Sequence, residues 1–162
     1  MAIGVPRETV WVALEALASA VQFTMPGAAT AAPFVTVSRR LLSIDQVPVE
    51  HRPALFQVEK TENVRQKTRM PTMRRWSAWW IVYTPGGANQ DPSNPIGAQT
   101  NSVILDAIES VIPVGDPEHG PEIVQTLGGL VHSCFIDGTI TKESGDLDSW
   151  GLIVVPLTII VP

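Results

Sequence analysis

Cys134 and His132 are the residues of this chain best suited to chemistry, and they stand two positions apart in the stretch TLGGLVHSCFIDGTI. On a strand, residues two apart share a face, so this pair could ligate a metal ion or act as a nucleophile and its base. A metal ion would need two more ligands, and no histidine or carboxylate stands nearby at a typical spacing. Neighbours on one strand also do not easily point a nucleophile and a base at each other. We therefore interpret both residues as core or half-buried.

The other candidates for catalysis have simpler structural explanations. The carboxylates of Asp137, Asp146 and Asp148 could supply an acid and a base, but they stand among turn residues, where Asp commonly bonds its own backbone. The glycine pair at 128–129 lies in no phosphate-binding loop and no dinucleotide fingerprint. A single cysteine excludes an internal disulfide and a cysteine-based zinc cluster. The sequence thus predicts no catalytic, cofactor-binding or metal-ligating residue and no cofactor, and we expect that the chain is not an enzyme.

One stretch combines basic and aromatic residues and is our candidate for an interaction site. Its members are Arg65, Lys67, Arg69, Arg74, Arg75 and Trp79. Arginines beside tryptophans are typical of proteins that bind single-stranded nucleic acid, in which bases stack on the rings. They are equally typical of protein interfaces. We favour protein association, because the chain as a whole is acidic with a formal net charge of −5; a solvated loop without a partner is the third interpretation.

The charge is segregated along the chain. Residues 39–75 hold nine of the eleven basic residues and four acids, a net charge of +5, whereas residues 76–162 hold one basic residue and ten acids, a net charge of −9. A surface can acquire such a distribution by accident. It is also what a subunit needs if its basic side binds the acidic side of an identical neighbour or of another partner. The acidic total argues against wholesale coating of nucleic acid, which requires a strongly positive surface.

A single domain spanning 1–162 must position these residues, since a chain of 162 residues with 44% apolar and 17% charged residues builds one core. Apolar residues at helical spacing predict one helix between Pro6 and Pro26 and a second near 101–112. Strands are predicted at 34–37, 54–58, 76–83, 130–141 and 150–161. The predicted fold class is α+β, with two main helices packed on one face of a twisted, mostly antiparallel sheet of about five strands.

Three details refine this prediction. The polar and basic segment 61–73 is interpreted as a long mobile loop or a hairpin arm. Pro156 interrupts the final strand and predicts an edge or bulged position for it. The strand at 76–83 alternates, with Trp76 and Trp80 on one face and Trp79 on the other. Because both faces carry bulk, we expect one face to meet a helix and the other to meet another surface.

The sequence indicates no association with a membrane. No run approaches the roughly 18–20 apolar residues that a bilayer span requires. The N-terminal apolar stretch contains Glu8 and Glu15 and lacks the basic-then-apolar order of a signal peptide. We therefore expect a compact domain made in a reducing compartment.

In the order and spacing of its segments, the chain resembles the tail-terminator proteins of long-tailed bacteriophages, also called minor tail or tail-completion proteins. The segments are RETVWVALEALA at 7–18, FVTVSRRL at 34–41, RPALFQVE at 52–59, IVYTP at 81–85, VILDAIESVI at 103–112, TLGGLVHSCFIDGTI at 126–140 and IVVPLTIIV at 153–161. Together they cover most of the chain. None of them is a catalytic motif, so their order and spacing carry the resemblance.

The resemblance implies a structural role in the virion. Proteins of this family form a ring, typically a hexamer, on the end of the completed tail tube, where they stop tube polymerisation and present a surface to the head connector. The implied partners are further copies of the chain, the tail tube protein and the head connector, with DNA only as transient cargo through the lumen. The implied location is the head-proximal end of the tail, after assembly in the host cytoplasm. No enzymatic activity or cofactor is carried over.

Under this resemblance, the basic residues of the 61–75 segment are candidates for contact with a neighbouring subunit, the tube or passing DNA. Three alternatives remain open. One is a module that binds single-stranded nucleic acid through the 65–80 stretch. Another is a different head–tail joining protein. The third is a small hydrolase with a site built on Cys134 or on aspartates.

Overall fold

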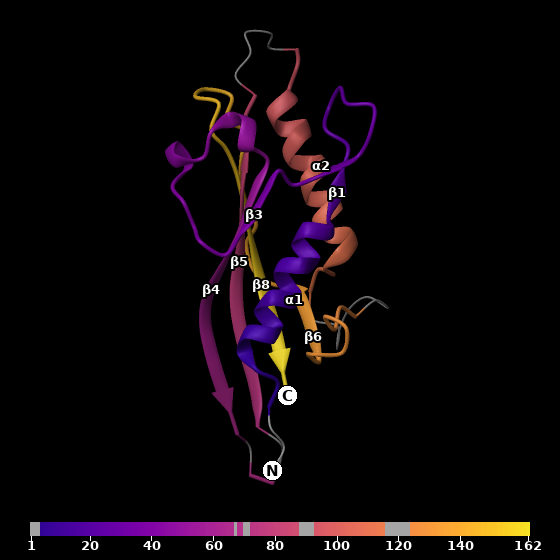
Figure 1. The fold of residues 1–162 in the computed structure, drawn as a ribbon, viewed down its shortest axis with the longest axis vertical. Helices are drawn as coiled ribbons and strands as arrows, with labels where there is room; N and C mark the ends of the chain where they lie inside the picture. The colour runs from indigo at the N-terminus through magenta and orange to yellow at the C-terminus, as the bar shows by residue number, and fades with distance from the viewer. Residues whose placement is uncertain (1–3, 67, 70–71, 88–92, 116–123) are drawn as a thin grey trace.

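A computed structural model describes residues 4–66, 68–69, 72–87, 93–115 and 124–162 of the chain (Figure 1). The elements are α1 (Arg7–Ala20), β1 (Gln22–Phe23), β2 (Ala32–Pro33), β3 (Thr36–Ser38), η1 (Ile44–Gln46), η2 (Val49–His51), β4 (Ala54–Arg65), β5 (Met73–Thr84), α2 (Ile96–Val111), β6 (Ser133–Ile136), β7 (Thr141–Glu143) and β8 (Gly151–Val161). Lys67, one of the predicted interaction residues, lies outside the described residues.

The main sheet has six strands in the order β3-β4-β5-β8-β6, with β7 also paired to β8. Every pairing in it is antiparallel except β3 with β4, so the sheet is mixed but mostly antiparallel. A separate two-stranded ribbon joins β1 and β2. The α+β class predicted from the sequence is confirmed, with six strands in place of about five.

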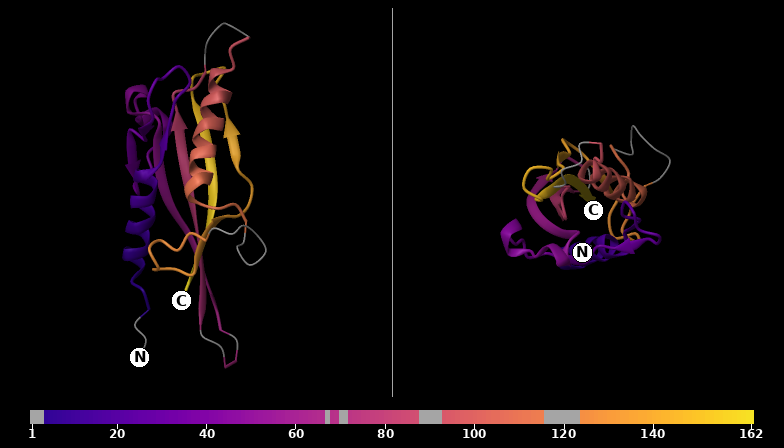
Figure 2. Two further views of the ribbon diagram at one scale, coloured as in Figure 1. Left: turned by 90° about the vertical axis from the view of Figure 1, so that its right-hand side faces the viewer. Right: turned by 90° about the horizontal axis from the view of Figure 1, so that it is seen from above.

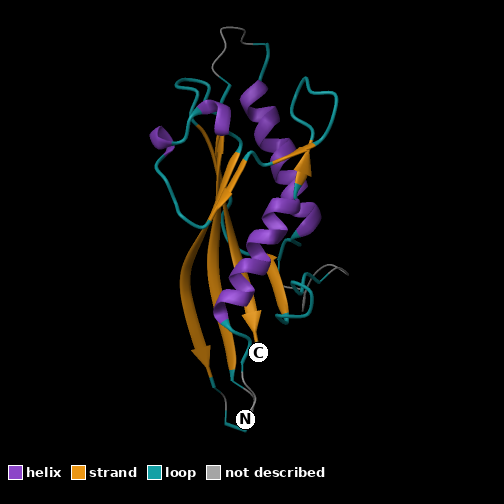
Figure 3. Cartoon of the chain, in the orientation of Figure 1, coloured by secondary structure: helices purple, strands orange, loops and turns teal. Residues whose placement is uncertain are grey.

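Both long helices lie against the same face of the sheet (Figures 1 and 3). Helix α1 contributes Val10, Trp11 and Leu14 to the core, and α2 contributes Ile104 and Ile108. Opposite them lie the residues of β5 and β8 that point to this face: Trp76, Ala78, Trp80, Val82, Ile153, Val155, Leu157 and Ile159. Alternate residues of a strand point to opposite faces, so the strict spacing of two in this set produces one continuous apolar layer.

The segment predicted as a mobile loop or hairpin arm is a hairpin. Strand β4 continues to Arg65 and β5 begins at Met73, so the two strands stay paired along 12 residues each. The register shifts between Glu59 and Thr61, as a bulge does. Strand β8 accompanies β5 as far as the pair of Arg74 with Val161, so only the end of the hairpin, at Arg65 and Met73, projects beyond the rest of the sheet (Figures 1 and 2).

The prediction that Pro156 places the last strand at an edge or a bulge is wrong, because β8 runs in register between β5 and β6. Strand β6 pairs with β8 only from Leu157 onward, and β7 only up to Val154. Pro156 lies between these two pairings, and its carbonyl accepts a hydrogen bond from the amide of Asp137. The nitrogen and the carbonyl of Pro156 face the bend between β6 and β7, where no strand pairs with β8. A proline is tolerated here because no partner strand needs the N–H that it lacks.

The segment that carries η1 and η2 covers the upper part of the other face of the sheet. It packs Val47 against Phe56 and Tyr83 in a second, smaller core. Arg52 fixes this segment, since its guanidinium donates to the carbonyls of Ile44 and Val47 at 2.8 Å each. No helix among the described residues covers the lower part of that face, as it is oriented in Figure 1. We call it the open face.

Candidate interaction surface

The structure places Cys134 in the core rather than in a site. It is fully buried on β6, whereas His132 is exposed just before that strand. Burial raises the pKa of the Cys134 thiol to about 12, because the thiolate would lose its hydration. A thiolate nucleophile is therefore not available at neutral pH. The aspartates considered for acid–base chemistry bond nearby groups: Asp137 accepts from Arg75 at 2.7 Å and Asp148 accepts from the amide of Trp150 at 3.1 Å.

The Cys134 thiol should be silent to Ellman's reagent in the folded protein at pH 8 and should react fully after unfolding in urea. A native thiol that reacts at the rate of a free cysteine would contradict its burial.

The pKa of the Cys134 thiol is higher in the folded protein than in the unfolded chain, where it is about 9. The folded protein therefore has its full stability from this group below about pH 9 and loses it as the pH rises towards about 12. Urea unfolding across that pH range measures the loss.

The structure does not bring together the five predicted interaction residues that it describes. Arg74 points to the helix face and donates to Glu62 at 3.1 Å, whereas its neighbour Arg75 points to the open face and donates to Asp137 at 2.7 Å. Arg65 and Arg69 are exposed near the end of the hairpin and form no ion pair with any described residue. Trp79 lies in the middle of the open face, away from that end. The alternation of a strand separates residues that are adjacent in sequence.

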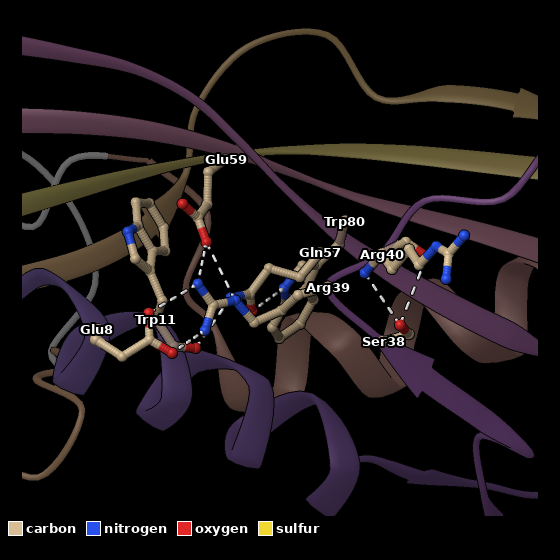
Figure 4. A network of polar contacts seen from close by, with 8 residues as sticks. All are labelled: Glu8, Trp11, Ser38, Arg39, Arg40, Gln57, Glu59 and Trp80. Carbon is tan, nitrogen blue, oxygen red and sulfur yellow. Dashed lines mark hydrogen bonds and ion pairs between the residues drawn. The ribbon is translucent and has the colours of Figure 1, made fainter.

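Three basic residues of 39–75, namely Arg39, Arg74 and Arg75, are paired with carboxylates of the same chain, as is Arg7. Arg39 lies between the carboxylates of Glu8 and Glu59, and Figure 4 shows its guanidinium bonded to both. Arg7 makes a bidentate pair with Glu62, with both N–O distances 2.8 Å. These two networks connect the start of α1 to the hairpin. The cations left without an ion pair to a described residue are the buried Arg52, whose guanidinium donates to backbone carbonyls, and the exposed Arg40, Lys60, Arg65, Arg69 and Lys142.

The networks lower the pKa of two carboxyl groups. A hydrogen bond from Arg39 lowers the pKa of Glu8, and a hydrogen bond from Arg7 lowers that of Glu62. We expect NMR titration to find both carboxyls ionising below the ordinary value of 4.5, and Arg39→Ala to raise the Glu8 midpoint while leaving that of Glu62 unchanged. The ionised carboxyls of Glu8 and Glu62 stabilise the folded state above about pH 4.5. This contribution to the free energy of unfolding is lost as the pH falls through their lowered pKa values. An unchanged Glu8 midpoint in the variant would contradict the contact.

One exposed surface combines apolar and cationic side chains that are not engaged elsewhere. We define the Trp79 surface as Arg40, Leu41, Val58, Lys60 and Trp79. Val58 is the register partner of Trp79, so their side chains share the open face. Trp79 is 39% exposed and Leu41 is 45% exposed, so together with Val58 they present apolar area to solvent.

The Trp79 surface is also hollowed and positively charged. A shallow hollow of about 530 Å³ at the edge of β4 is lined by Arg39, Arg40, Leu41, Val58 and Glu59. The ammonium of Lys60 lies 3.8 Å from the centre of the Trp79 ring, a cation–π contact. The Arg40 guanidinium points away from the carboxylates that hold Arg39 (Figure 4).

Sequence reasoning identified Trp79 but missed the four residues around it. Arg40 and Leu41 follow β3, and only the parallel pairing of β3 with β4 brings them beside Val58. The alternation of β5 did predict that Trp79 faces away from Trp80. Nothing in the local sequence marks Lys60, because its position over the ring depends on the bulge between Glu59 and Thr61.

A second surface, on the outer side of α2, carries the opposite charge. We define the α2 acidic face as Ser102, Val103, Asp106 and Glu109. Asp106 and Glu109 are exposed, stand three residues apart on one side of the helix, and form no ion pair with any described residue. Val103 is half-exposed beside them. Helix α2 packs over the β8 side of the sheet, whereas the Trp79 surface lies towards the β4 edge.

Within the part of the chain that the structure describes, three or more His, Cys, Asp or Glu side chains nowhere gather as a metal site would require. None of the described helices is long and apolar enough to cross a membrane. The chain matches no protein-family model, and no curated protein matches it significantly in sequence. The Trp79 surface and the α2 acidic face are the candidate functional features among the described residues.

Proposed function

We propose that the protein is a structural subunit of a bacteriophage tail. In this proposal it forms a ring of several copies, six in the typical case, on the head-proximal end of the tail tube, stops tube polymerisation and joins the tube to the head connector. The observation that carries the proposal is the presence of two complementary surfaces on opposite flanks of one domain. The order and spacing of segments that resemble tail-terminator proteins support the same assignment.

Opposite flanks matter because of ring geometry. A ring of identical subunits uses a heterologous contact, in which one patch of each copy binds a different patch of the next. The Trp79 surface and the α2 acidic face differ in charge, and the charged groups of both form no ion pair with another described residue. The projecting hairpin, which ends near Arg65 and Arg69, is free to reach the tube or DNA in the lumen (Figure 1).

Light scattering over a concentration series, combined with negative-stain microscopy, tests the ring directly. We expect discrete rings about 60–100 Å across, the size that several domains of this length produce. In the phage that encodes the chain, its deletion should produce overlong or headless tails. Tails of normal length that carry heads would overturn the proposal, and rings found only on head connectors would assign the protein to head–tail joining instead.

Binding of single-stranded nucleic acid is the second candidate, and the exposed Trp79 with Lys60 over its ring favours it. A stacking platform of this kind predicts quenching of tryptophan fluorescence by oligonucleotides, with a strong dependence on salt. Unchanged fluorescence at low salt would remove this candidate. Quenching that disappears in Trp79→Ala would support it against ring formation.

A further inference from the structure

We propose that the Trp79 surface of one copy binds the α2 acidic face of the next copy, and that this contact closes the ring. The inference rests on the proposed function and assigns its subunit interface. It commits to one partner, a second copy of this chain. The contact would join Arg40 and Lys60 to Asp106 and Glu109.

The Trp79 surface has the composition of an interface centre. Trp and Arg are the residues most enriched where truncation costs the most binding energy. Trp79, Leu41 and Val58 provide apolar area, and Arg40 and Lys60 border it without a carboxylate partner among the described residues. Such a patch on an isolated domain exposes apolar surface to water, and a partner with acids at matching positions would cover it.

The α2 acidic face supplies the complementary charge. Its two acids lie on one side of the helix, and the half-exposed Val103 provides an apolar contact for Leu41 or Trp79. Opposite charges placed across an interface steer the encounter of the two surfaces and fix their register. Each surface thus carries two charged groups without an ion pair to a described residue, Arg40 and Lys60 on one and Asp106 and Glu109 on the other.

Two other arrangements of two copies are less favourable. A symmetric contact between two Trp79 surfaces would bring Arg40 and Lys60 of both copies together. Repulsion between these like charges opposes such a contact. Pairing of β4 with a strand of the next copy would have to accommodate the bulge and the charges of Glu59 and Lys60, features that block addition of a strand at an edge. A head-to-tail contact through side chains avoids both problems.

The spatial arrangement fits a head-to-tail contact. Figure 1 shows β4 at one flank of the molecule and α2 towards the other, and Figure 2, seen from above, keeps the two on opposite sides. Each copy can therefore bind one neighbour through each flank. Repetition of one such contact generates a ring when its rotation closes.

Charge reversal on each side tests this pairing by sedimentation velocity at low salt. We expect the double variants R40E/K60E and D106K/E109K each to raise the concentration needed for assembly at least tenfold. An equimolar mixture of the two should assemble as wild type does, because both kinds of contact in an alternating ring then join opposite charges. Lys142→Glu, which reverses an exposed cation on β7 outside both surfaces, is the matched control and should leave assembly unchanged.

The outcomes separate this inference from the proposed function. Wild-type rings with unaffected R40E/K60E assembly would overturn the contact while the ring stands, and so would a mixture that fails to recover. A wild-type chain that stays monomeric at the highest concentration reached would overturn the ring and its contact together. Circular dichroism of each variant confirms its fold, since all four substituted side chains are exposed.

Discussion

Arg52→Ala should destabilise the protein by about 3–5 kcal/mol, measured by urea unfolding, since each buried carbonyl left without a donor costs roughly 1–3 kcal/mol. The side chain is 7% exposed and its Nε and Nη2 groups donate to Val47 and Ile44 at 2.8–3.0 Å. Its Nη1 group also lies 3.5 Å from the carbonyl of Thr84 and 3.4 Å from that of Ser149. Arg52 thus holds three separate segments, and no carboxylate among the described residues pairs with it.

Two further variants define the origin of this effect. Arg52→Lys keeps the charge but cannot donate from a planar fork to several carbonyls, so it should recover only part of the lost stability. Arg40→Ala removes an exposed arginine and should change the free energy of unfolding by no more than about 0.5 kcal/mol. Equal stability of Arg52→Ala and wild type would show that water replaces the guanidinium without cost and would contradict the buried role.

Trp80→Ala should lower the free energy of unfolding by about 3–5 kcal/mol, the range for removal of a large aromatic side chain from a core. The indole is fully buried. Its Nε1 lies 3.4 Å from the Oε1 atom of Gln57, whose amide nitrogen donates to the carbonyl of Trp11 at 2.9 Å. Trp80→Phe, which fills most of the volume but removes the donor, should cost less than Trp80→Ala.

Trp79→Ala is the matched control, because it changes the adjacent residue of the same strand. Trp79 is on the open face, so its removal should cost no more than about 1 kcal/mol in stability. If the proposed contact exists, the same variant should lose ring assembly while remaining folded. A Trp79→Ala protein that is as unstable as Trp80→Ala would show that the open face is part of the core.

The elements of this fold follow largely from local sequence. Helix α1 begins directly after Pro6, as its predicted start requires, and its apolar residues recur at helical spacing. The alternation of 76–83 predicted that Trp80 and Trp79 lie on opposite faces, and the register confirms it. Periodicity is a local property, so it can be read without knowing what packs against the strand.

The sequence alone did not decide where β8 lies or how long the hairpin is. A proline at 156 favours an edge on local grounds, yet β8 is central because β6 and β7 pair with it on either side of that residue. The polar segment 61–73 lacks the apolar pattern of a strand. Its residues 61–65 and 73 are paired nonetheless, because β5 is anchored by Trp76 and β8, and the backbone bonds of β4 extend along it.

The sequence by itself determined the α+β class, the opposite facing of the tryptophans and the segregation of charge along the chain. Only the tertiary structure decided which charges remain available for binding. Arg39, Arg74 and Arg75 are paired with acids from distant segments, whereas Arg40 and Lys60 are brought beside Trp79. Ion pairs and surface patches depend on distances between residues far apart in the chain, and register and packing, not local composition, set those distances.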